Sequence, residues 1–540
     1  MAAKEAEQTE IEVENEELQE DIAPGDCGSA MLIASDSFDS LVGNDYETEL
    51  AIKKKKSHIN EIVRQGSFEQ EDSCGEQADV NHIGPYGDAT TPSASEESSG
   101  EQSDPSMTKE LSAVLDEISK SPDHDDDDVK TPEWKAQSKH VFILSDSGKP
   151  VYSRYGNEDK LVTVFGVMQA LVSFVQDSAH DSIRSLVAGE HRIIFLHHEN
   201  IILVCVTRGS ESDRLIRIQL NYLYNQILSV LTLSTLKKIF KQRRNYDLRR
   251  QLSGSEKFLD SLLTMMEREP GLLLSAVRCL PLECQTRDMI AQSIVQHAKV
   301  KDLVFALIIA NSQLVTLVRM KKYFLHPMDL HIIINLINAA ESFKAAESWT
   351  PICLPKFDSS GFLQAHISYL DEACQTCLLL LTVDRDSFFT LSGCKTKITE
   401  RLIKYNGLKA ISDSLRKDSY NISKCGISDL RHFLYKNKST AQYTSPELEA
   451  PYLSPGEQER LFGLYHYLHN RIHSSARPLK ILYHVGQYEA LLGWVTQGFE
   501  LYAVFSPLVT KSLAINAVNK LMAWIRKEAS RLFILESVTF

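Results

Sequence analysis

From Lys139 onward, the sequence alternates between short apolar runs and segments in which apolar residues recur every three or four positions. Residues 139–156 contain two apolar runs around the turn residues Asp146, Ser147 and Gly148, which predicts a β-hairpin. The apolar spacing within 158–177 then predicts a helix with one buried face. The unit is completed by strand-like runs and a helix, at 182–187, 191–198, 200–207 and about 213–233.

The same order of elements returns twice more along the chain. The second copy begins with a hairpin within 303–319 and a helix entered after Pro327, and the third copy begins at Asp429. Their further strands are expected at 351–355, 362–370, 375–383, 479–485, 489–496 and 499–505, and their last helices at 385–405 and from about 510 through Trp524. This threefold order predicts the α+β class, with three domains that each contain an antiparallel sheet flanked by helices.

Charge divides the chain into two unlike parts. Residues 1–138 contain 35 Asp and Glu against 10 Lys and Arg, a net charge of -25. The remaining residues, 139–540, contain 37 Asp and Glu against 48 Lys and Arg, a net charge of +11, and the two parts sum to the overall net charge of -14. The first part is rich in Glu, Asp, Ser and Gly, and it cannot bury enough apolar surface to offset its ordering entropy. We therefore predict that residues 1–138 are a disordered acidic arm with a short helix near 109–120. We also predict that this arm reversibly masks the basic surface of the body.

These patterns predict five segments in a chain of 540 residues, which is too long for one core. They are a regulatory arm (1–138), a first domain (139–236), a basic helical connector (237–298), a second domain (299–415) and a third domain (426–540). No run reaches the ~18 apolar residues of a membrane span, and the acidic start resembles no targeting signal, so we expect a cytosolic protein. Ten cysteines are too few for a disulfide framework and fit a reducing compartment.

The motifs of covalent catalysis and metal binding are missing. SGCKTK at 392–397 resembles a phosphate-binding loop but lacks its first glycine and the strand before it. His198 and Glu199 resemble the start of the zinc-binding motif H-E-x-x-H, but Ile202 occupies the position of its second histidine. Cys374 and Cys377 form one C-x-x-C without a second pair, which favours a structural role. We therefore predict a binding protein with no catalytic residue, no metal and no cofactor.

A basic segment at 237–250 is the first candidate site. It contains Lys237, Lys238, Lys241, Arg243, Arg244, Arg249 and Arg250 against only Asp247. At ~1 kcal/mol for each basic residue near an anionic leaflet, the segment predicts membrane attraction of at most several kcal/mol. A solvated helix face fits it as well. Binding to nucleic acid is a third and weaker option, because no aromatic stacking platform accompanies these residues.

Trp349 is the second candidate, in ESWTPICLPKF between a predicted helix and strand. The flanking Pro351 and Pro355 predict a loop there. A tryptophan in a loop usually covers its own core, and that interpretation is favoured here, while an exposed one would be a docking anchor.

Several motifs of the body closely resemble the Mon family, the monensin-sensitivity vacuolar-fusion proteins. They are HVFILSDSGKPVYSRYG, NYDLRRQLSGSE, FLHPMDLH, WTPICLPKFDSSGFLQAHISYL, DLRHFLYK and AWIRKEASRLFIL, which follow in order through 139–540. The resemblance implies three longin domains and a heterodimer with a Ccz-type partner. It implies that the heterodimer is a guanine-nucleotide exchange factor for the late-endosomal Rab GTPase, with a third subunit as a further partner in animals.

The resemblance also implies recruitment to endosomes, where the chain would lie peripherally, by the early-endosomal Rab and by anionic lipids including phosphoinositides. It assigns the lipid contact to 237–250 and the contact with the recruiting Rab to Trp349. The GTPase-facing surface is expected on the first domain around 158–177, where Lys160, Gln169 and Gln176 lie off the apolar face. An adaptor or tether that binds Rab GTPases without exchange activity, and a nucleic-acid-binding protein, are the rival hypotheses.

Overall fold

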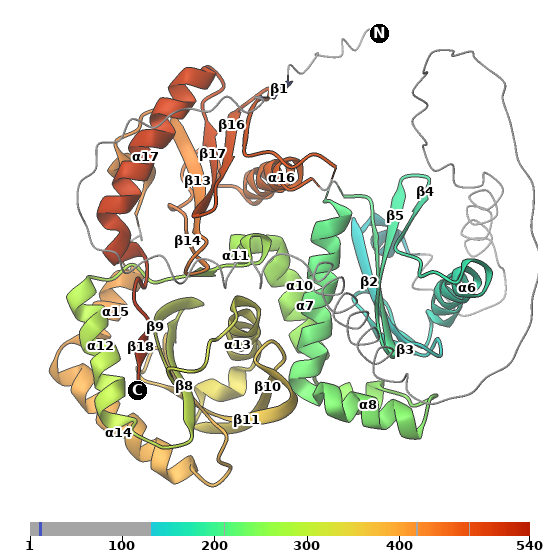
Figure 1. The fold of residues 1–540 in the computed structure, drawn as a ribbon, viewed down its shortest axis with the longest axis horizontal. Helices are drawn as coiled ribbons and strands as arrows, with labels where there is room; N and C mark the ends of the chain where they lie inside the picture. The colour runs from blue at the N-terminus through green and yellow to red at the C-terminus, as the bar shows by residue number, and fades with distance from the viewer. Residues whose placement is uncertain (1–9, 13–130, 210, 417–419, 475) are drawn as a thin grey trace, which may run out of the picture. The chain divides into compact units, whose positions relative to one another are not determined.

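Three sheets of seven, six and five strands, each between helices, form the body of the protein, and each contains five strands from one repeat (Figure 1). The computed structural model describes residues 10–12, 131–209, 211–416, 420–474 and 476–540, all of which belong to one compact unit. The helix expected at 109–120 and the rest of the acidic arm up to residue 130, apart from 10–12, lie outside the described residues.

The first repeat follows a short helix, α5 (Pro132–Ala136). Its strands are β2 (Lys139–Ser145), β3 (Pro150–Ser153), β4 (Ser185–Ala188), β5 (His191–His198) and β6 (Ile201–Thr207). Helix α6 (Val162–Ala179) packs on one face of this sheet and α7 (Asp213–Leu231) on the other. The predicted turn between β2 and β3 contains Gly148 at φ 79°, a left-handed conformation that glycine adopts without strain.

The connector contains α8 (Leu233–Gln242), α9 (Arg249–Leu252), α10 (Glu256–Arg268), α11 (Pro270–Leu274) and α12 (Cys284–His297). It is not wholly helical, because β7 (Val277–Arg278) pairs with a strand of the third repeat. The basic residues of 237–250 lie on two helices and on the segment between them, since α8 ends at Gln242 and α9 begins at Arg249.

The second repeat contains β8 (Leu303–Ala310), β9 (Gln313–Arg319), α13 (Pro327–Ala339), a 3-10 turn (Glu341–Lys344), β10 (Ser348–Leu354), β11 (Asp358–Tyr369), β12 (Thr376–Thr382), α14 (Phe388–Lys404) and α15 (Gly407–Arg416). Pro327 occupies the first position of α13, where a missing N–H costs nothing, and His326 Nδ1 accepts the Met328 N–H. The prediction that Trp349 lies in a loop is wrong, because it is the second residue of β10. Proline is tolerated there because β10 is an edge strand.

The third repeat contains a 3-10 turn (Ile422–Cys425), β13 (Leu430–Asn437), β14 (Gln442–Thr444), α16 (Pro455–Ile472), β15 (Ile481–Val485), β16 (Ala490–Val495), β17 (Phe499–Phe505) and α17 (Lys511–Leu532). Two short strands extend the sheets: β1 (Glu10–Glu12) pairs with β15, and β18 (Val538–Thr539) with β9. Helices α16 and α17 cover opposite faces of the sheet.

All three sheets have the same strand order. When the five strands of each repeat are numbered along the chain, every sheet runs 2-1-5-4-3, and every neighbouring pair among these strands is antiparallel. The predicted repeat and α+β class are therefore confirmed. The first and second repeats share one continuous core, in which Tyr222 of α7 bonds His331 of α13 at 2.9 Å.

Candidate functional site

Helix α6 is apolar on two opposite sides. Phe165, Met168 and Val172 point into the first sheet and are buried. On the other side, Val162, Gly166, Ala170 and Phe174 follow one another at intervals of four residues, and all four are exposed. The side chains of Val162 and Phe174 are 56% and 57% exposed. We call these four residues the α6 outer stripe.

The α6 outer stripe lacks the polar character of a solvent-facing helix surface. No charged residue occurs between Leu161 and Gln176, and the first one on the helix is Asp177. An exposed helix surface that carries apolar and small residues without any charge is a candidate for contact with another protein. Glycine and alanine at the centre of the stripe would allow close approach of another backbone. The first repeat therefore presents a surface suited to a protein partner.

The structure does not bring the three predicted GTPase-facing residues together. Lys160 is exposed in the turn before α6, and Gln176 is exposed ~24 Å farther along the helix at 1.5 Å per residue. Gln169 Nε2 instead donates hydrogen bonds to the Asp146 carbonyl at 3.1 Å and to Ser173 Oγ at 3.3 Å. Gln169 thus holds the turn between β2 and β3 against α6.

The basic segment is partly neutralised by residues far away in the sequence. Lys237 pairs with Glu199 at 2.8 Å, Arg244 lies 3.8 Å from Asp146, and Arg249 pairs with Asp159 at 2.6 Å and Asp247 at 3.2 Å. The exposed residues without an ion pair within the described part of the chain are Lys238, Lys241, Arg243 and Arg250. The net attraction available to an anionic surface is therefore smaller than the sequence predicts.

Trp349 is half-buried rather than fully enclosed. Its ring packs edge-on against Phe388 at 5.9 Å and His366 at 6.5 Å. Behind it, Glu347 accepts a hydrogen bond from Lys395 at 3.1 Å and lies 3.0 Å from His366. Partial burial opposes ionisation of Glu347, but hydrogen bonds from neighbouring side chains outweigh it and lower the pKa of Glu347. Trp349 thus covers its own core with one face and lies on the edge strand of the second sheet.

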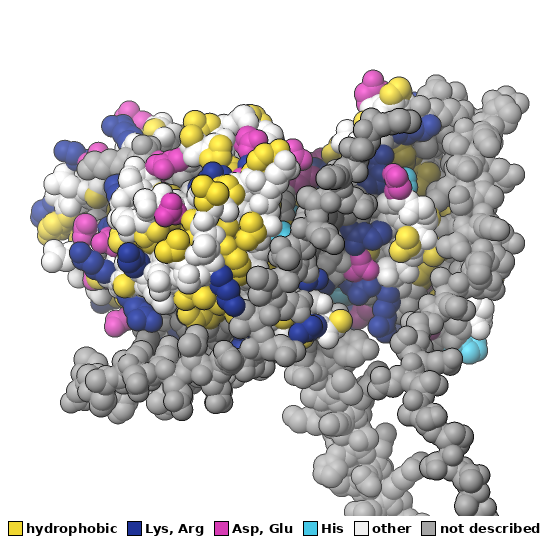
Figure 2. All heavy atoms as spheres, turned by 90° about the horizontal axis from the view of Figure 1, so that it is seen from above, with side chains coloured by type: hydrophobic (Ala, Val, Ile, Leu, Met, Phe, Trp, Pro, Cys, Tyr) yellow, Lys and Arg dark blue, Asp and Glu magenta, His cyan; other side chains and the backbone are white. Residues whose placement is uncertain are grey.

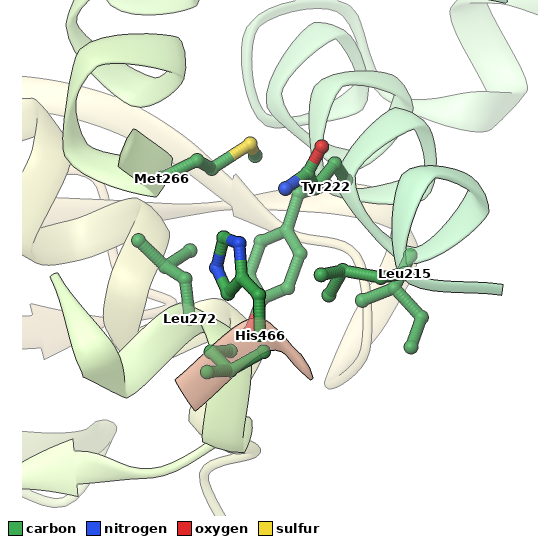
Figure 3. A pocket seen from close by; sticks show the side chains of 8 residues that line it. Leu215, Tyr222, Met266, Leu272 and His466 are labelled. Atoms are coloured by element: carbon green, nitrogen blue, oxygen red, sulfur yellow. The ribbon is translucent and has the colours of Figure 1, made fainter. Parts of the chain in front are cut away.

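Two cavities in the described part of the chain lie between repeats. The smaller, between Leu215, Tyr222, Met266, Leu272 and His466, measures about 10 Å³ and holds at most one water (Figure 3). The larger measures about 210 Å³, and its polar lining includes Glu269, Arg278, Gln313, His331 and Tyr443. Burial raises the pKa of the Glu269 carboxyl and lowers that of His331 to about 4. Tyr443 and Glu269 hydrogen-bond each other in this lining, and burial raises the pKa of the Tyr443 hydroxyl, which opposes its activation as a nucleophile.

The cysteines and histidines singled out in the sequence have structural positions. His197 and His198 end β5, as predicted, and Cys377 is buried in β12, where burial raises the pKa of its thiol to about 12. Among the described residues, no group of three His, Cys, Asp or Glu side chains could hold a metal ion. No helix in the same ranges is both long and apolar enough to cross a membrane.

Exposed apolar side chains also occur on the third repeat. Figure 2 shows them there between side chains of both charge signs. Leu508, before α17, is 88% exposed, Tyr488 is 59% exposed and Leu513 is 54% exposed. This surface mixes charges, and nothing in the described residues indicates what would cover it.

Family models match all three repeats. The first longin domain of FUZ, MON1 and HPS1 matches residues 139–262, the second matches 301–400 and the third matches 429–529. These matches confirm the longin architecture implied by the resemblance.

Similar proteins cover the same region. Vacuolar fusion protein MON1 homolog A of Gallus gallus is 51% identical over 416 residues, 77% of this chain and 75% of that protein. Protein SAND of Takifugu rubripes is 50% identical over 415 residues, 77% of this chain and 79% of that protein. Vacuolar fusion protein MON1 homolog B of Homo sapiens is 42% identical over 427 residues, 75% of this chain and 77% of that protein. With three matched longin domains and half of the aligned residues identical, the chain belongs to the MON1 family of vacuolar fusion proteins.

Proposed function

We propose that this chain is one subunit of a heterodimeric guanine-nucleotide exchange factor for the late-endosomal Rab GTPase. A Ccz-type longin protein is the other subunit, and the pair promotes early-to-late endosome conversion and fusion with the lysosome or vacuole. The α6 outer stripe is the observation that carries this proposal. An exposed helix surface without charge from Val162 to Gln176 is suited to contact with a partner, and a longin domain of similar architecture could supply one.

Exchange requires no covalent chemistry. A factor that binds the nucleotide-free GTPase more tightly than the loaded one speeds nucleotide release by linkage. Each ~1.4 kcal/mol removed from the release barrier gives a tenfold faster rate. A chain with three longin domains fits this role. Of the predicted GTPase-facing residues, Lys160 and Gln176 stay candidates for contact with the GTPase. The side-chain amide of Gln169 instead donates a hydrogen bond to the Asp146 carbonyl in the turn before β3.

Recruitment is the second part of the proposal. The early-endosomal Rab would contact the edge strand that contains Trp349, and anionic lipids including phosphoinositides would contact the exposed lysines and arginines of 237–250. The protein then acts peripherally on endosomal membranes. A third subunit would bind elsewhere on the pair in animals.

Release of a fluorescent guanine nucleotide from the late-endosomal Rab tests the proposal. The assay compares this chain alone, the Ccz-type partner alone and the two together. We expect acceleration only by the pair, because the GTPase-facing surface is shared. If the pair binds the Rab without accelerating release, the adaptor or tether hypothesis replaces the exchange factor. Salt-sensitive binding to duplex nucleic acid without liposome binding would favour the nucleic-acid hypothesis instead.

A further inference from the structure

Three parts of the chain meet around the larger cavity. Strand β7 of the connector pairs with β14 of the third repeat, so that Arg278 lies opposite Tyr443. Directly after β7, Cys279 forms a bridge with Leu314 of β9 in the second repeat. The turn between β8 and β9, helix α13 and the segment around α11 complete the walls (Figure 1). We call this cavity of about 210 Å³ the junction pocket.

Close packing fixes the walls of the junction pocket. A Cβ atom at Gly271 would lie 2.7 Å from the Ala276 carbonyl oxygen and 3.0 Å from Tyr443 Cε1, so a larger residue would push the Tyr443 ring away. His331 is held from two sides, because the Tyr222 hydroxyl donates to its Nδ1 at 2.9 Å and its Nε2–H donates to the Ala276 carbonyl at 3.1 Å. Burial lowers the pKa of His331 to about 4, so its ring is an uncharged part of the wall at neutral pH.

Glu269 and Arg278 bring opposite charges to the junction pocket. Glu269 accepts a hydrogen bond from the Tyr443 hydroxyl, and Arg278 Nη2 donates one to the Ser445 carbonyl at 3.2 Å. A carboxylate and a guanidinium can each make further hydrogen bonds. Glu269 is accessible to solvent, yet the walls around it limit its hydration and raise the pKa of its carboxyl, so a cation beside it would be favoured. A lining with one charge of each sign suits a ligand that also carries both.

The rest of the lining offers an acceptor and an apolar wall. The side-chain oxygen of Gln313 is enclosed and has no hydrogen-bond partner among the described residues. Buried polar atoms are normally paired, so an unpaired acceptor beside a pocket points to a donor on a ligand. Met265, Leu272, Val277 and Ile334 form the apolar wall of the pocket. A ligand with an apolar portion would therefore bury it against these four side chains.

The size of the junction pocket limits its ligand. A volume of about 210 Å³ has room for on the order of seven waters at ~30 Å³ each, and it is smaller than the ~300–1,000 Å³ of pockets that hold drug-sized molecules. A nucleotide is therefore too large for it.

We propose that the junction pocket binds a free α-amino acid with an apolar side chain. Glu269 and Gln313 hold the ammonium group of the ligand, Arg278 holds its carboxylate, and its side chain lies against the apolar wall. The ligand then contacts the connector, the second repeat and the third repeat at once, so its binding stabilises their junction. This inference goes beyond the proposed function and does not depend on exchange activity.

Isothermal titration of the full chain with L-leucine and L-methionine tests the junction pocket. Two analogues of leucine separate its charged groups: isocaproate lacks the amino group, and isoamylamine lacks the carboxylate. We expect each analogue to bind at least about tenfold more weakly than L-leucine, because each leaves one charged side chain of the pocket without its partner.

Variants locate the binding within the pocket. Glu269→Gln keeps the shape of the side chain and removes its charge, and it should weaken binding of L-leucine about tenfold. Gln313→Leu is similar in size and lacks the unpaired oxygen, so it should weaken binding as well. The matched control is Glu283→Gln, the same change at an exposed carboxylate outside the pocket, and it should bind as the wild-type chain does.

Amide hydrogen exchange gives a second readout. At a ligand concentration of about 100 times Kd, exchange in residues 269–278, 311–313 and 442–444 should slow by up to roughly 100-fold. Exchange of each variant without ligand is compared with that of the wild-type chain, to show that the walls of the pocket are intact.

Weaker binding by both analogues and both pocket variants, with protection in these three segments, would support the assignment. Absence of binding at millimolar concentrations of L-leucine and L-methionine would overturn it. Equal binding by the analogues, unchanged binding by the two pocket variants whose walls are intact, or protection only elsewhere in the chain would also overturn it.

Discussion

Arg287 of α12 is a buried cation whose loss should release the last helix of the third repeat. Its side chain is only 5% exposed, and it donates hydrogen bonds to four backbone carbonyl oxygens. These belong to Leu280 at 2.7 Å, Ser530 at 3.2 Å, Arg531 at 3.0 Å and Phe533 at 2.5 Å. Three of the four lie at the C-terminal end of α17, where carbonyl groups lack partners within the helix and the helix dipole favours a positive charge.

Arg287→Met keeps most of the volume of the side chain and removes the donors. Removing a charged partner from buried acceptors costs about 3–5 kcal/mol. Burial lowers the pKa of the Arg287 guanidinium, so its desolvation offsets part of the stabilisation by these hydrogen bonds. We therefore expect Arg287→Met to lower the free energy of opening of this region by ~3 kcal/mol. That loss corresponds to roughly 150-fold faster amide hydrogen exchange in the last turn of α17.

Hydrogen exchange followed by mass spectrometry measures this loss locally. Arg526→Met is the matched control, because Arg526 lies on the same helix but is exposed, and we expect its effect to stay within ~0.5 kcal/mol. If Arg287→Met changes exchange in the last turn of α17 less than about fivefold, the four hydrogen bonds do not hold the third repeat to the connector as argued.

Three further predictions concern single side chains. Phe165→Ala should cost ~3–5 kcal/mol in a urea melt because Phe165 is fully buried, whereas Phe174→Ala on the same helix should leave stability within ~0.5 kcal/mol and weaken capture of the Ccz-type partner. Burial raises the pKa of Asp329 to about 7, so the folded state holds a proton that the unfolded state has lost above about pH 4. Stability should therefore fall by at most ~1.4 kcal/mol per pH unit between about pH 4 and 7, and melts of Asp329→Asn should lack that fall. Trp349→Ala should leave exchange in solution intact and abolish recruitment to Rab-bearing liposomes, and a loss of folding would instead identify Trp349 as a core residue.

Periodicity predicted the repeated architecture because strand and helix spacings are local properties of the chain. The three copies were recognisable from alternating apolar runs and turn residues, and each copy folds into the same strand order. Trp349 was assigned wrongly because Pro351 and Pro355 resemble a loop signal, yet an edge strand also accepts proline. The two-residue strand β7 is too short to leave a pattern in the sequence.

The candidate site depended more on contacts between distant residues. The basic segment looked like one cationic surface, but Glu199, Asp146 and Asp159 reach it from the first repeat. Gln169 lies off the buried face of α6 as predicted, but its hydrogen bond to the turn before β3 depends on the fold. The signal for the α6 outer stripe was present in the sequence, as a helix without charge before Asp177. A helix on a sheet usually buries a single apolar face, so periodicity does not by itself predict a second one.

Nucleotide release by the pair, measured against increasing concentrations of the Ccz-type partner, tests the central claim most directly. Ala170→Glu places a charge at the centre of the α6 outer stripe and costs only a few tenths of a kcal/mol in helix propensity, so the chain should still fold. Ala523→Glu, at an exposed position of α17, is the matched control. The account predicts that Ala170→Glu abolishes partner-dependent release of nucleotide from the late-endosomal Rab while Ala523→Glu does not. Equal release by Ala170→Glu and the wild-type chain, or acceleration by this chain without its partner, would contradict it.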